Sequence, residues 1–266
     1  MPRLSNGTHY QRYGTIDAPS LVLIHGLGLS QSTWDDYIEP LSKDYDVIVF
    51  DLYGHGDSAL PPRTPDLTLF AEQIIDLMND LAIEQTVMIG FSLGGMINRR
   101  IALDHPHRVA GLIILNSPHE RGEAEQAKVE TRARMTAEEG IASTMDATLE
   151  RWFTPAFRAS HPERVDQVRQ GVLANNLDAY AACRYVLANG VVELIRPSQP
   201  IHAPSLVITC EHDSGSTPAM TKAIADEIPD AVHQIIPTLQ HMGLVERPDL
   251  FLPPMLDFLN RLDRNK

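Results

Sequence analysis

Hydrophobic positions divide the first 118 residues into two kinds of segment that alternate. Short, continuous apolar runs are typical of strands buried on both faces, whereas apolar residues that recur every three or four positions are typical of amphipathic helices. The strand-like runs are LVLIHG, YDVIVFDLYG, TVMIGFS and VAGLIILNS. A helix-like segment, LFAEQIIDLMNDLAI, lies between the second run and the third. This alternation predicts an α/β fold: a mostly parallel sheet with helices on both of its faces.

The pattern changes between residues 119 and 196, where every long segment has the period of a helix. The alternation then returns with the strand-like runs SLVITC and VHQIIP, and the helix between them is expected to begin with Thr217 as N-cap and Pro218 at its first position. We therefore expect an α/β core formed by residues 1–118 and 197–266, and a helical cap formed by residues 119–196. A cap inserted before the strand SLVITC would lie over the sheet edge where such folds bind ligands.

Charge and composition narrow the possible partners. The 266 residues carry a formal net charge of −13, which repels a phosphate backbone, so we expect no nucleic-acid partner. No apolar run approaches the length that spans a bilayer, and the N-terminus MPRLSNGTHY has no apolar leader, so we expect neither membrane insertion nor secretion. The two cysteines, Cys183 and Cys210, form no C-x-x-C pair, which indicates a reducing, cytoplasmic compartment.

One serine stands in a context that suggests chemistry. Gly90-Phe91-Ser92-Leu93-Gly94 matches G-x-S-x-G directly after a predicted strand and directly before a predicted helix. The glycines permit a tight turn that would project the Ser92 hydroxyl, and the helix N-terminus offers N–H groups to a developing anion. A glycine-rich turn with a solvated serine is the simpler interpretation of the five residues alone, but the strand and the helix around them favour a nucleophile.

A serine hydroxyl needs a base to remove its proton. Among the eleven histidines, His241 follows the last predicted strand and precedes the last predicted helix, which is a suitable place for the base. Asp213, after the strand SLVITC, is the expected carboxylate that orients this base, and Glu211 is its nearest competitor. The joint occurrence of Ser92, Asp213 and His241, each after a strand and in this order, is more specific than any single match.

Acyl transfer also requires N–H donors for an oxyanion. The expected donors are the backbone N–H of Leu93 and that of Leu27, which lies in the glycine loop HGLG after the first strand. His25, in the same loop, is expected to be a structural hydrogen-bonding residue. His55 and Asp57, in DLYGHGDS, suggest a metal site at first sight, but no complementary ligands accompany them in the sequence, so we expect no metal.

These segments together resemble the α/β-hydrolase superfamily over essentially the whole chain. HGLG, DLYGHGDS, GFSLGG, EHDSGSTP and QHMGLVERPDLF occur in the order and spacing of that family. The resemblance implies an α/β-hydrolase fold with a mostly parallel sheet of the eight-stranded type. It also implies a serine hydrolase in which Ser92 is the nucleophile, Asp213 the acid and His241 the base.

The predicted cap carries a narrower likeness. The segment from Leu149 to Leu187, above all WFTPAF and YAAC, looks like the cap of 3-oxoadipate enol-lactonases. This likeness implies hydrolysis of a small carboxylic ester or lactone without a cofactor. A lactone derived from a dicarboxylate needs a cation in its pocket. The candidate cations are Arg121, Arg132, Arg134 and Arg184. Arg184 and Trp152 are the first choices for residues that contact the substrate, because both lie in the segment that resembles the enol-lactonase cap. The candidates for an apolar lining are Met135, Met145 and Tyr180, although such residues at helical spacing are more often core.

Other activities stay open at this point. The same fold can hydrolyse a C–C bond of a ring-cleavage product, act as a perhydrolase or acyl transferase, or serve as a ligand receptor whose triad lines a binding pocket. The segment NSPHERGEAEQAK departs from the small-residue stretch expected in enol-lactonases and borders the pocket. This difference affects the expected substrate more than the expected mechanism.

Overall fold

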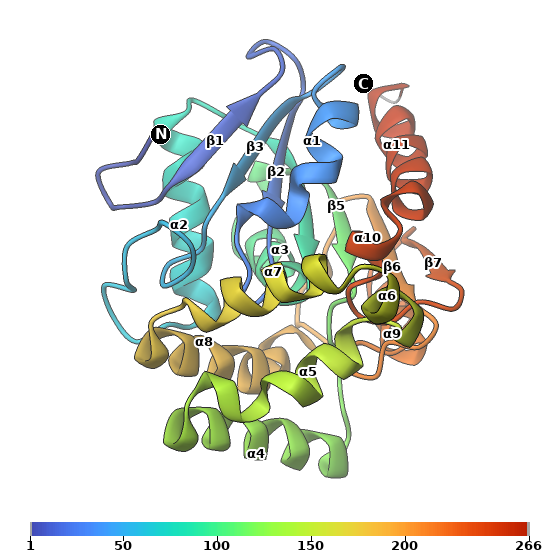
Figure 1. The fold of residues 1–266 in the computed structure, drawn as a ribbon. Coiled ribbons are helices and arrows are strands. Elements are labelled where there is room, and N and C mark those ends of the chain that lie inside the picture. Colours follow the sequence, from blue (N-terminus) through green and yellow to red (C-terminus); the bar gives the residue numbers. More distant parts are fainter. Residues whose placement is uncertain (1, 265–266) are drawn as a thin grey trace.

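A seven-stranded sheet organises residues 2–264, the part of the chain that the computed structural model describes (Figure 1). The strand order is β1-β3-β2-β4-β5-β6-β7, and every neighbouring pair is parallel except β1 with β3. The strands are β1 (Tyr10–Tyr13), β2 (Ser20–Ile24), β3 (Asp46–Phe50), β4 (Thr86–Phe91), β5 (Val109–Leu115), β6 (Ser205–Cys210) and β7 (Val232–Ile236). The predicted α/β class with a mostly parallel sheet is confirmed.

The strand count differs from the expected eight-stranded type. Before β1 the chain turns at Gly7, whose φ is 86°, and forms an isolated bridge between Arg3 and His9 instead of a further strand. β1 itself was not predicted, because its sequence, YQRY, has no apolar run. All four of its residues are half-buried at the edge of the sheet, so these positions do not need to be apolar.

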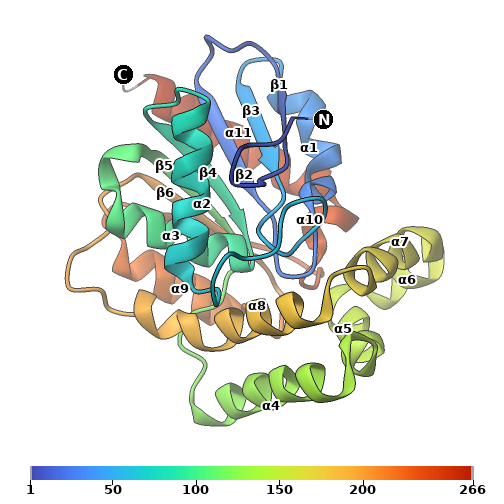
Figure 2. The same cartoon turned by 90° about the vertical axis from the view of Figure 1, so that its left-hand side faces the viewer.

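Helices cover both faces of the sheet (Figure 2). On one face α2 packs against α3, and on the other face α1 packs against α11. The helix α9 begins where predicted, since the Thr217 hydroxyl accepts a hydrogen bond from the Met220 N–H at 3.3 Å. The bounds are η1 (Gln31–Trp34), α1 (Asp35–Leu41), α2 (Leu67–Asp80), α3 (Leu93–Asp104), η2 (Pro106–Arg108), α9 (Pro218–Glu227), α10 (Gly243–Glu246) and α11 (Pro248–Arg264).

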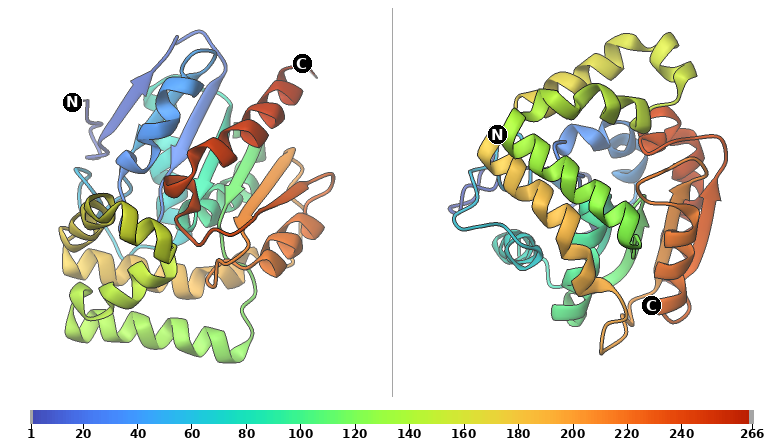
Figure 3. Two further views of the ribbon diagram at one scale, coloured as in Figure 1. Left: turned by 45° about the vertical axis from the view of Figure 1, so that its right-hand side comes forward. Right: turned by 90° about the horizontal axis from the view of Figure 1, so that it is seen from below.

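The chain between β5 and β6 is helical throughout its regular structure and lies at one end of the sheet (Figure 1, Figure 3). Its elements are α4 (Glu123–Glu139), η3 (Ile141–Thr144), α5 (Met145–Trp152), α6 (Pro155–Ser160), α7 (Pro162–Leu173), α8 (Leu177–Asn189) and η4 (Gly190–Leu194). α4 packs on α8, and α8 lies between α4 and the sheet (Figure 1). We call the helices α4 to α8 the cap. Within residues 2–264, no helix combines the length and the apolar character that crossing a bilayer requires.

Candidate active site

Ser92 occupies a sharp turn between β4 and α3. Its φ of 54° and ψ of −110° are rare for a residue other than glycine, and its N–H donates to the Leu115 carbonyl of β5 at 2.8 Å. The flanking glycines are required by space: a Cβ on Gly90 would lie 2.3 Å from the Gly94 carbonyl oxygen, and a Cβ on Gly94 would lie 2.2 Å from the carbonyl oxygen of Ile24 in β2. The two glycines of the G-x-S-x-G motif therefore allow α3 to pack this closely against the ends of the strands.

Asp213 and His241 meet after β6 and β7. His241 Nδ1 lies 2.7 Å from Asp213 Oδ2, so a neutral imidazole that donates this hydrogen bond presents Nε2 as a base. Asp213 also accepts hydrogen bonds from Asn116 Nδ2 at 2.9 Å and from the Ser216 N–H at 2.9 Å. Burial raises the pKa of Asp213, but the charge of His241 and these hydrogen bonds outweigh burial and hold the pKa below its ordinary value. The carboxylate is therefore ionised at neutral pH.

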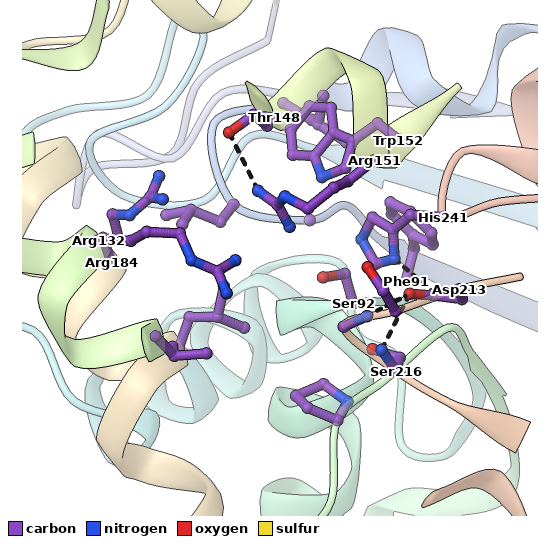
Figure 4. Close-up of a pocket in the computed structure, with 18 of the residues that line it drawn as sticks. Phe91, Ser92, Arg132, Thr148, Arg151, Trp152, Arg184, Asp213, Ser216 and His241 are labelled. Atoms are coloured by element: carbon purple, nitrogen blue, oxygen red, sulfur yellow. Dashed lines mark hydrogen bonds and ion pairs between the residues drawn. The ribbon is translucent and has the colours of Figure 1, made fainter. Parts of the chain in front are cut away.

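Ser92, Asp213 and His241 line one cavity, and Figure 4 shows the Ser92 hydroxyl and the His241 ring facing the same space. The imidazole lies between two aromatic rings, with centroids 5.0 Å away for Phe91 and 6.0 Å away for Trp152. Ser92 is only 6% exposed, so a reacting molecule reaches its hydroxyl through this cavity. A hydroxyl, a base and an orienting carboxylate thus converge in the way that nucleophilic catalysis requires.

The competing acid lies elsewhere. Glu211 is exposed, and its Oε2 accepts a hydrogen bond from the Thr238 N–H at 2.8 Å. The carboxylate in contact with His241 is that of Asp213.

The loop that carries His241 is tied to the cap. The Met242 N–H donates to the Trp152 carbonyl at 2.8 Å. The Glu246 carboxylate accepts hydrogen bonds from the Thr154 N–H at 2.7 Å and from the Thr154 hydroxyl at 2.6 Å. We call these contacts between residues 152–154 and residues 242–246 the clasp. Through it, the end of α5 and the loop of the candidate base form one hydrogen-bonded unit.

The two expected oxyanion donors lie near Ser92. Leu93 is the first residue of α3, so its N–H has no acceptor within the helix, and Leu27 lines the cavity. A Cβ on Gly26 would lie 3.2 Å from Ser92 Cβ, so the loop before Leu27 runs close to the serine. His25 holds this loop, because Nδ1 bonds the Gly26 carbonyl at 2.8 Å and Nε2 accepts a backbone N–H after β3 at 3.0 Å.

The cavity has a volume of about 100 Å³ and lies between Ser92 and the cap. Trp152, Tyr180 and Arg184 line it, and so do Arg121 and Arg132. Arg134 does not line it: two positions after Arg132 on α4, it points to another side of the helix, where it is exposed and donates to Thr131 Oγ1 at 3.0 Å.

Met135 and Met145 were expected to form an apolar lining of the pocket, but neither is among the residues around the cavity. Met145 is 2% exposed and belongs to the hydrophobic core at the start of α5. Met135 is half-buried on α4, next to the exposed Arg134. Helical spacing indicates that a methionine faces something apolar, but it does not distinguish cap packing from a cavity wall.

Two residues of the site were missed by sequence reasoning. Arg151 lines the cavity and directly precedes Trp152, so the segment LERWF contained the signal. Asn116 bonds Asp213, and its φ of 46° is the left-handed conformation that asparagine tolerates better than most residues. Its position at the end of a predicted strand, before the cap, is a signal of the same kind as those that identified Ser92 and Asp213.

A possible cluster of metal ligands lies away from this cavity. Ligand atoms of His9, Asp51 and Asp57 are within 4.8 Å of one another, and His55 is not part of the group. Asp51 accepts hydrogen bonds from the Gln31 N–H at 2.8 Å and from the Asp57 N–H at 3.0 Å, which hold the turn after β3. These contacts account for the buried carboxylate as a structural group.

Comparison with known proteins identifies the family. A family model described as alpha/beta hydrolase fold matches residues 19–248. Over 246 residues the chain is 30% identical to 3-oxoadipate enol-lactonase 2 of Acinetobacter baylyi, with 91% of this chain and 89% of the relative covered. It is 28% identical to (E)-2-((N-methylformamido)methylene)succinate hydrolase of the same organism, with 93% and 92% covered.

A solved structure agrees with these matches. The enol-lactonase from Burkholderia xenovorans LB400 superposes with a TM-score of 0.86 at 28% identity, and the match covers 95% of this chain and 96% of that one. The predicted resemblance to enol-lactonases is confirmed. With most of its length matched by the family model, the chain belongs to the α/β-hydrolase fold family and is an enzyme of the hydrolase class.

Proposed function

We propose that this enzyme hydrolyses small carboxylic esters or lactones through an acyl-enzyme, with Ser92, His241 and Asp213 as its catalytic triad. One observation carries the proposal: the strained Ser92 turn and the Asp213–His241 hydrogen bond border the same small cavity. The names of the relatives support hydrolysis as the reaction class, since one is an enol-lactonase and the other a hydrolase of a succinate derivative.

The mechanism follows from the roles of the three side chains. His241 Nε2 takes the hydroxyl proton while Ser92 Oγ attacks the carbonyl carbon, and the N–H groups of Leu27 and Leu93 stabilise the resulting oxyanion. The imidazolium, stabilised by the ionised Asp213, gives its proton to the leaving oxygen as the carbon–oxygen bond breaks. Water then attacks the acyl carbon with the same imidazole as base, and Ser92 recovers its proton. In a lactone the leaving oxygen stays attached to the acyl chain.

Replacement of Ser92 by alanine tests this proposal. We expect Ser92→Ala to keep the fold and to lose hydrolysis of p-nitrophenyl acetate by more than about 10³-fold, because the nucleophile is gone. The matched control is Ser143→Ala, which removes an exposed cap hydroxyl that donates to the Gly140 carbonyl at 2.7 Å. Wild-type turnover by Ser92→Ala would refute the mechanism, and circular dichroism checks the fold of both variants.

A substrate panel separates this reaction from the other activities of the fold. Enol-lactones and aryl esters should be turned over many times, whereas a C–C hydrolase would prefer a dienoate from ring cleavage. A perhydrolase or acyl transferase would favour peroxide or an alcohol over water as acceptor. A receptor would show one stoichiometric burst and no further turnover. A serine-directed phosphonate should label Ser92 once per chain, as read by mass spectrometry.

A further inference from the structure

Three arginines of the cap converge on the cavity from three different helices. Arg132 belongs to α4, Arg151 to α5 and Arg184 to α8, and all three line the space that Ser92 and His241 also line. Figure 4 shows Arg132 and Arg184 together on one side of this space and Arg151 nearer to His241. Three positive charges from separate helices therefore surround the place where a substrate would lie.

Most of the donors on these guanidinium groups have no partner within the part of the chain that the structure describes. Each guanidinium carries five N–H groups. Among residues 2–264, the Arg184 side chain makes one hydrogen bond, to the Tyr180 hydroxyl at 3.1 Å. Arg151 donates to the Ala147 carbonyl and to Thr148 Oγ1, both at 3.2 Å, and no hydrogen bond of the Arg132 side chain occurs in this part of the chain. The remaining donors are available to a ligand.

These charges also lack the carboxylate partners that two other arginines of the cap have. Arg169 pairs with Asp146 at 2.6 Å, and Arg164 pairs with Asp36. Within the described residues, none of the three cavity arginines forms a salt bridge with a carboxylate. Arg121, a fourth arginine of the lining, differs again because it donates to the carbonyls of the last turn of α8 at 3.0 Å and so braces the cap.

Assembling these cations costs stability in the free protein. Burial lowers the pKa of Arg151 to about 10, and the charges of Arg132 and Arg184 add to this effect. Burial likewise lowers the pKa of Arg132, and Arg184 lowers it further. The guanidinium groups repel one another, and an anion in the space that they line would offset this repulsion.

We propose that Arg132, Arg151 and Arg184 bind two carboxylate groups of the substrate, so that this hydrolase acts on esters or lactones of small polycarboxylic acids. The inference rests on the proposed function for the position of the reacting bond. A guanidinium matches a carboxylate with two parallel hydrogen bonds, and the cavity of about 100 Å³ limits the acid to a short chain.

The number and the origin of the cations argue for two separate carboxylates. A single carboxylate would leave two of the three charges without a partner beside the cavity. Two carboxylates would leave one guanidinium without a partner. Arg151 is suited to be this guanidinium, because it lies close enough to Asp213 for the two charges to interact. A phosphate group would concentrate its charge at one point, whereas these arginines are spread over three helices.

Binding to the Ser92→Ala variant tests the inference without any reaction. Calorimetric titration with succinate, butyrate and inorganic phosphate compares two carboxylates, one carboxylate and a compact dianion. We expect succinate to bind about 10- to 100-fold more tightly than butyrate, and more tightly than phosphate, because charge-assisted hydrogen bonds to the second carboxylate are added. Equal binding of succinate and butyrate, or tightest binding of phosphate, would overturn the proposal.

Matched arginine variants then locate the effect. In the Ser92→Ala background, Arg132→Gln and Arg184→Gln should each lose most of the preference for succinate, whereas Arg134→Gln, an exposed arginine of the same helix α4, should keep it. The two cavity variants should also retain or raise the midpoint of thermal unfolding, since each relieves repulsion. If both variants keep the preference, or if Arg134→Gln loses it equally, the assignment is wrong.

Catalysis gives a second readout in the enzyme with Ser92 intact. The ratio of kcat/KM for a mono-p-nitrophenyl ester of tricarballylic acid to that for p-nitrophenyl butyrate should fall about 10- to 100-fold in Arg132→Gln. If Ser92→Ala keeps full hydrolysis, the proposed function fails while the titration still reports on the arginines. If the wild type hydrolyses p-nitrophenyl acetate but shows no preference for the diacid ester, the arginine proposal fails alone.

Discussion

Replacement of Gly94 by alanine tests whether the turn at Ser92 is set by the space between α3 and β2. The added Cβ would lie 2.2 Å from the Ile24 carbonyl oxygen, 2.8 Å from the Ile24 carbonyl carbon and 2.9 Å from the His25 carbonyl oxygen. All three atoms are backbone, so no side chain can rotate to make room. Relief requires that β2 and α3 separate by about 1 Å, since non-bonded atoms reach their optimum near 3.5 Å.

The expected loss of stability follows from two opposing terms. Overpacking of this kind costs about 3 kcal/mol, and the higher helix propensity of alanine returns about 1 kcal/mol. The net loss of about 2 kcal/mol should lower Tm by roughly 4–8 °C. Movement of β2 would also displace the Gly26–Leu27 loop, so activity of the folded variant should fall about 100-fold, as a misplacement of this size near reacting groups can cause.

The control is the same substitution at a helical glycine with open surroundings. Gly171 in α7 is exposed, and a Cβ there meets nothing within 4 Å. Gly171→Ala should therefore raise stability by about 0.5–1 kcal/mol, and Tm by roughly 1–4 °C. Thermal unfolding followed by circular dichroism compares the two variants. A Tm of Gly94→Ala at or above that of the wild type would refute the steric account of the turn.

Two further predictions concern buried polar groups. Asn116→Gly removes the amide that donates to Asp213 and keeps the backbone φ of 46° accessible, so kcat should fall about 10-fold and the acid limb of the pH profile of kcat/KM should move to higher pH; an unchanged profile would contradict this role. Burial lowers the pKa of His55 to about 3, so below pH 6.5 only the unfolded chain takes up this proton. The free energy of unfolding should therefore fall as pH drops from 6.5 toward 3, by up to about 1.4 kcal/mol per pH unit from this residue, and urea titrations of His55→Gln should show a shallower dependence.

The sequence was most informative where a single physical requirement acts on neighbouring residues. Strands buried on both faces demand continuous apolar runs, and β2 to β6 were found for that reason. Ser92 and Asp213 follow such strands, β4 and β6, so their place at one end of the sheet could be predicted from the chain alone. His241 follows β7, whose first three residues are exposed, and was identified by its position between the last predicted strand and the last predicted helix. Edge strand β1 is half-buried and escaped detection because no such requirement acts on it.

The cap was less predictable because its side chains are assigned by packing between helices. Arg132 and Arg134 have the same chemistry and lie two positions apart, yet one lines the cavity and the other is exposed. The rotation of α4 about its axis decides between them, and that rotation depends on how α4 packs on α8. The sequence of α4 does not predict this rotation, because its apolar stripe is weak: only Ala133 and Thr136 are fully buried in this helix.

The clasp between residues 152–154 and 242–246 has a consequence for the design of chimeric enzymes. A foreign cap grafted onto this core would have to offer a carbonyl at the place of Trp152 and donors for Glu246, or the imidazole-bearing loop would lose two anchors. Exchange of the whole cap would therefore disturb the loop of His241, the proposed proton acceptor, together with the lining of the cavity. Side chains of α4 and α8 share no hydrogen bond with that loop in the described residues, so we expect their replacement to change the cavity and to leave His241, the proposed base, in place.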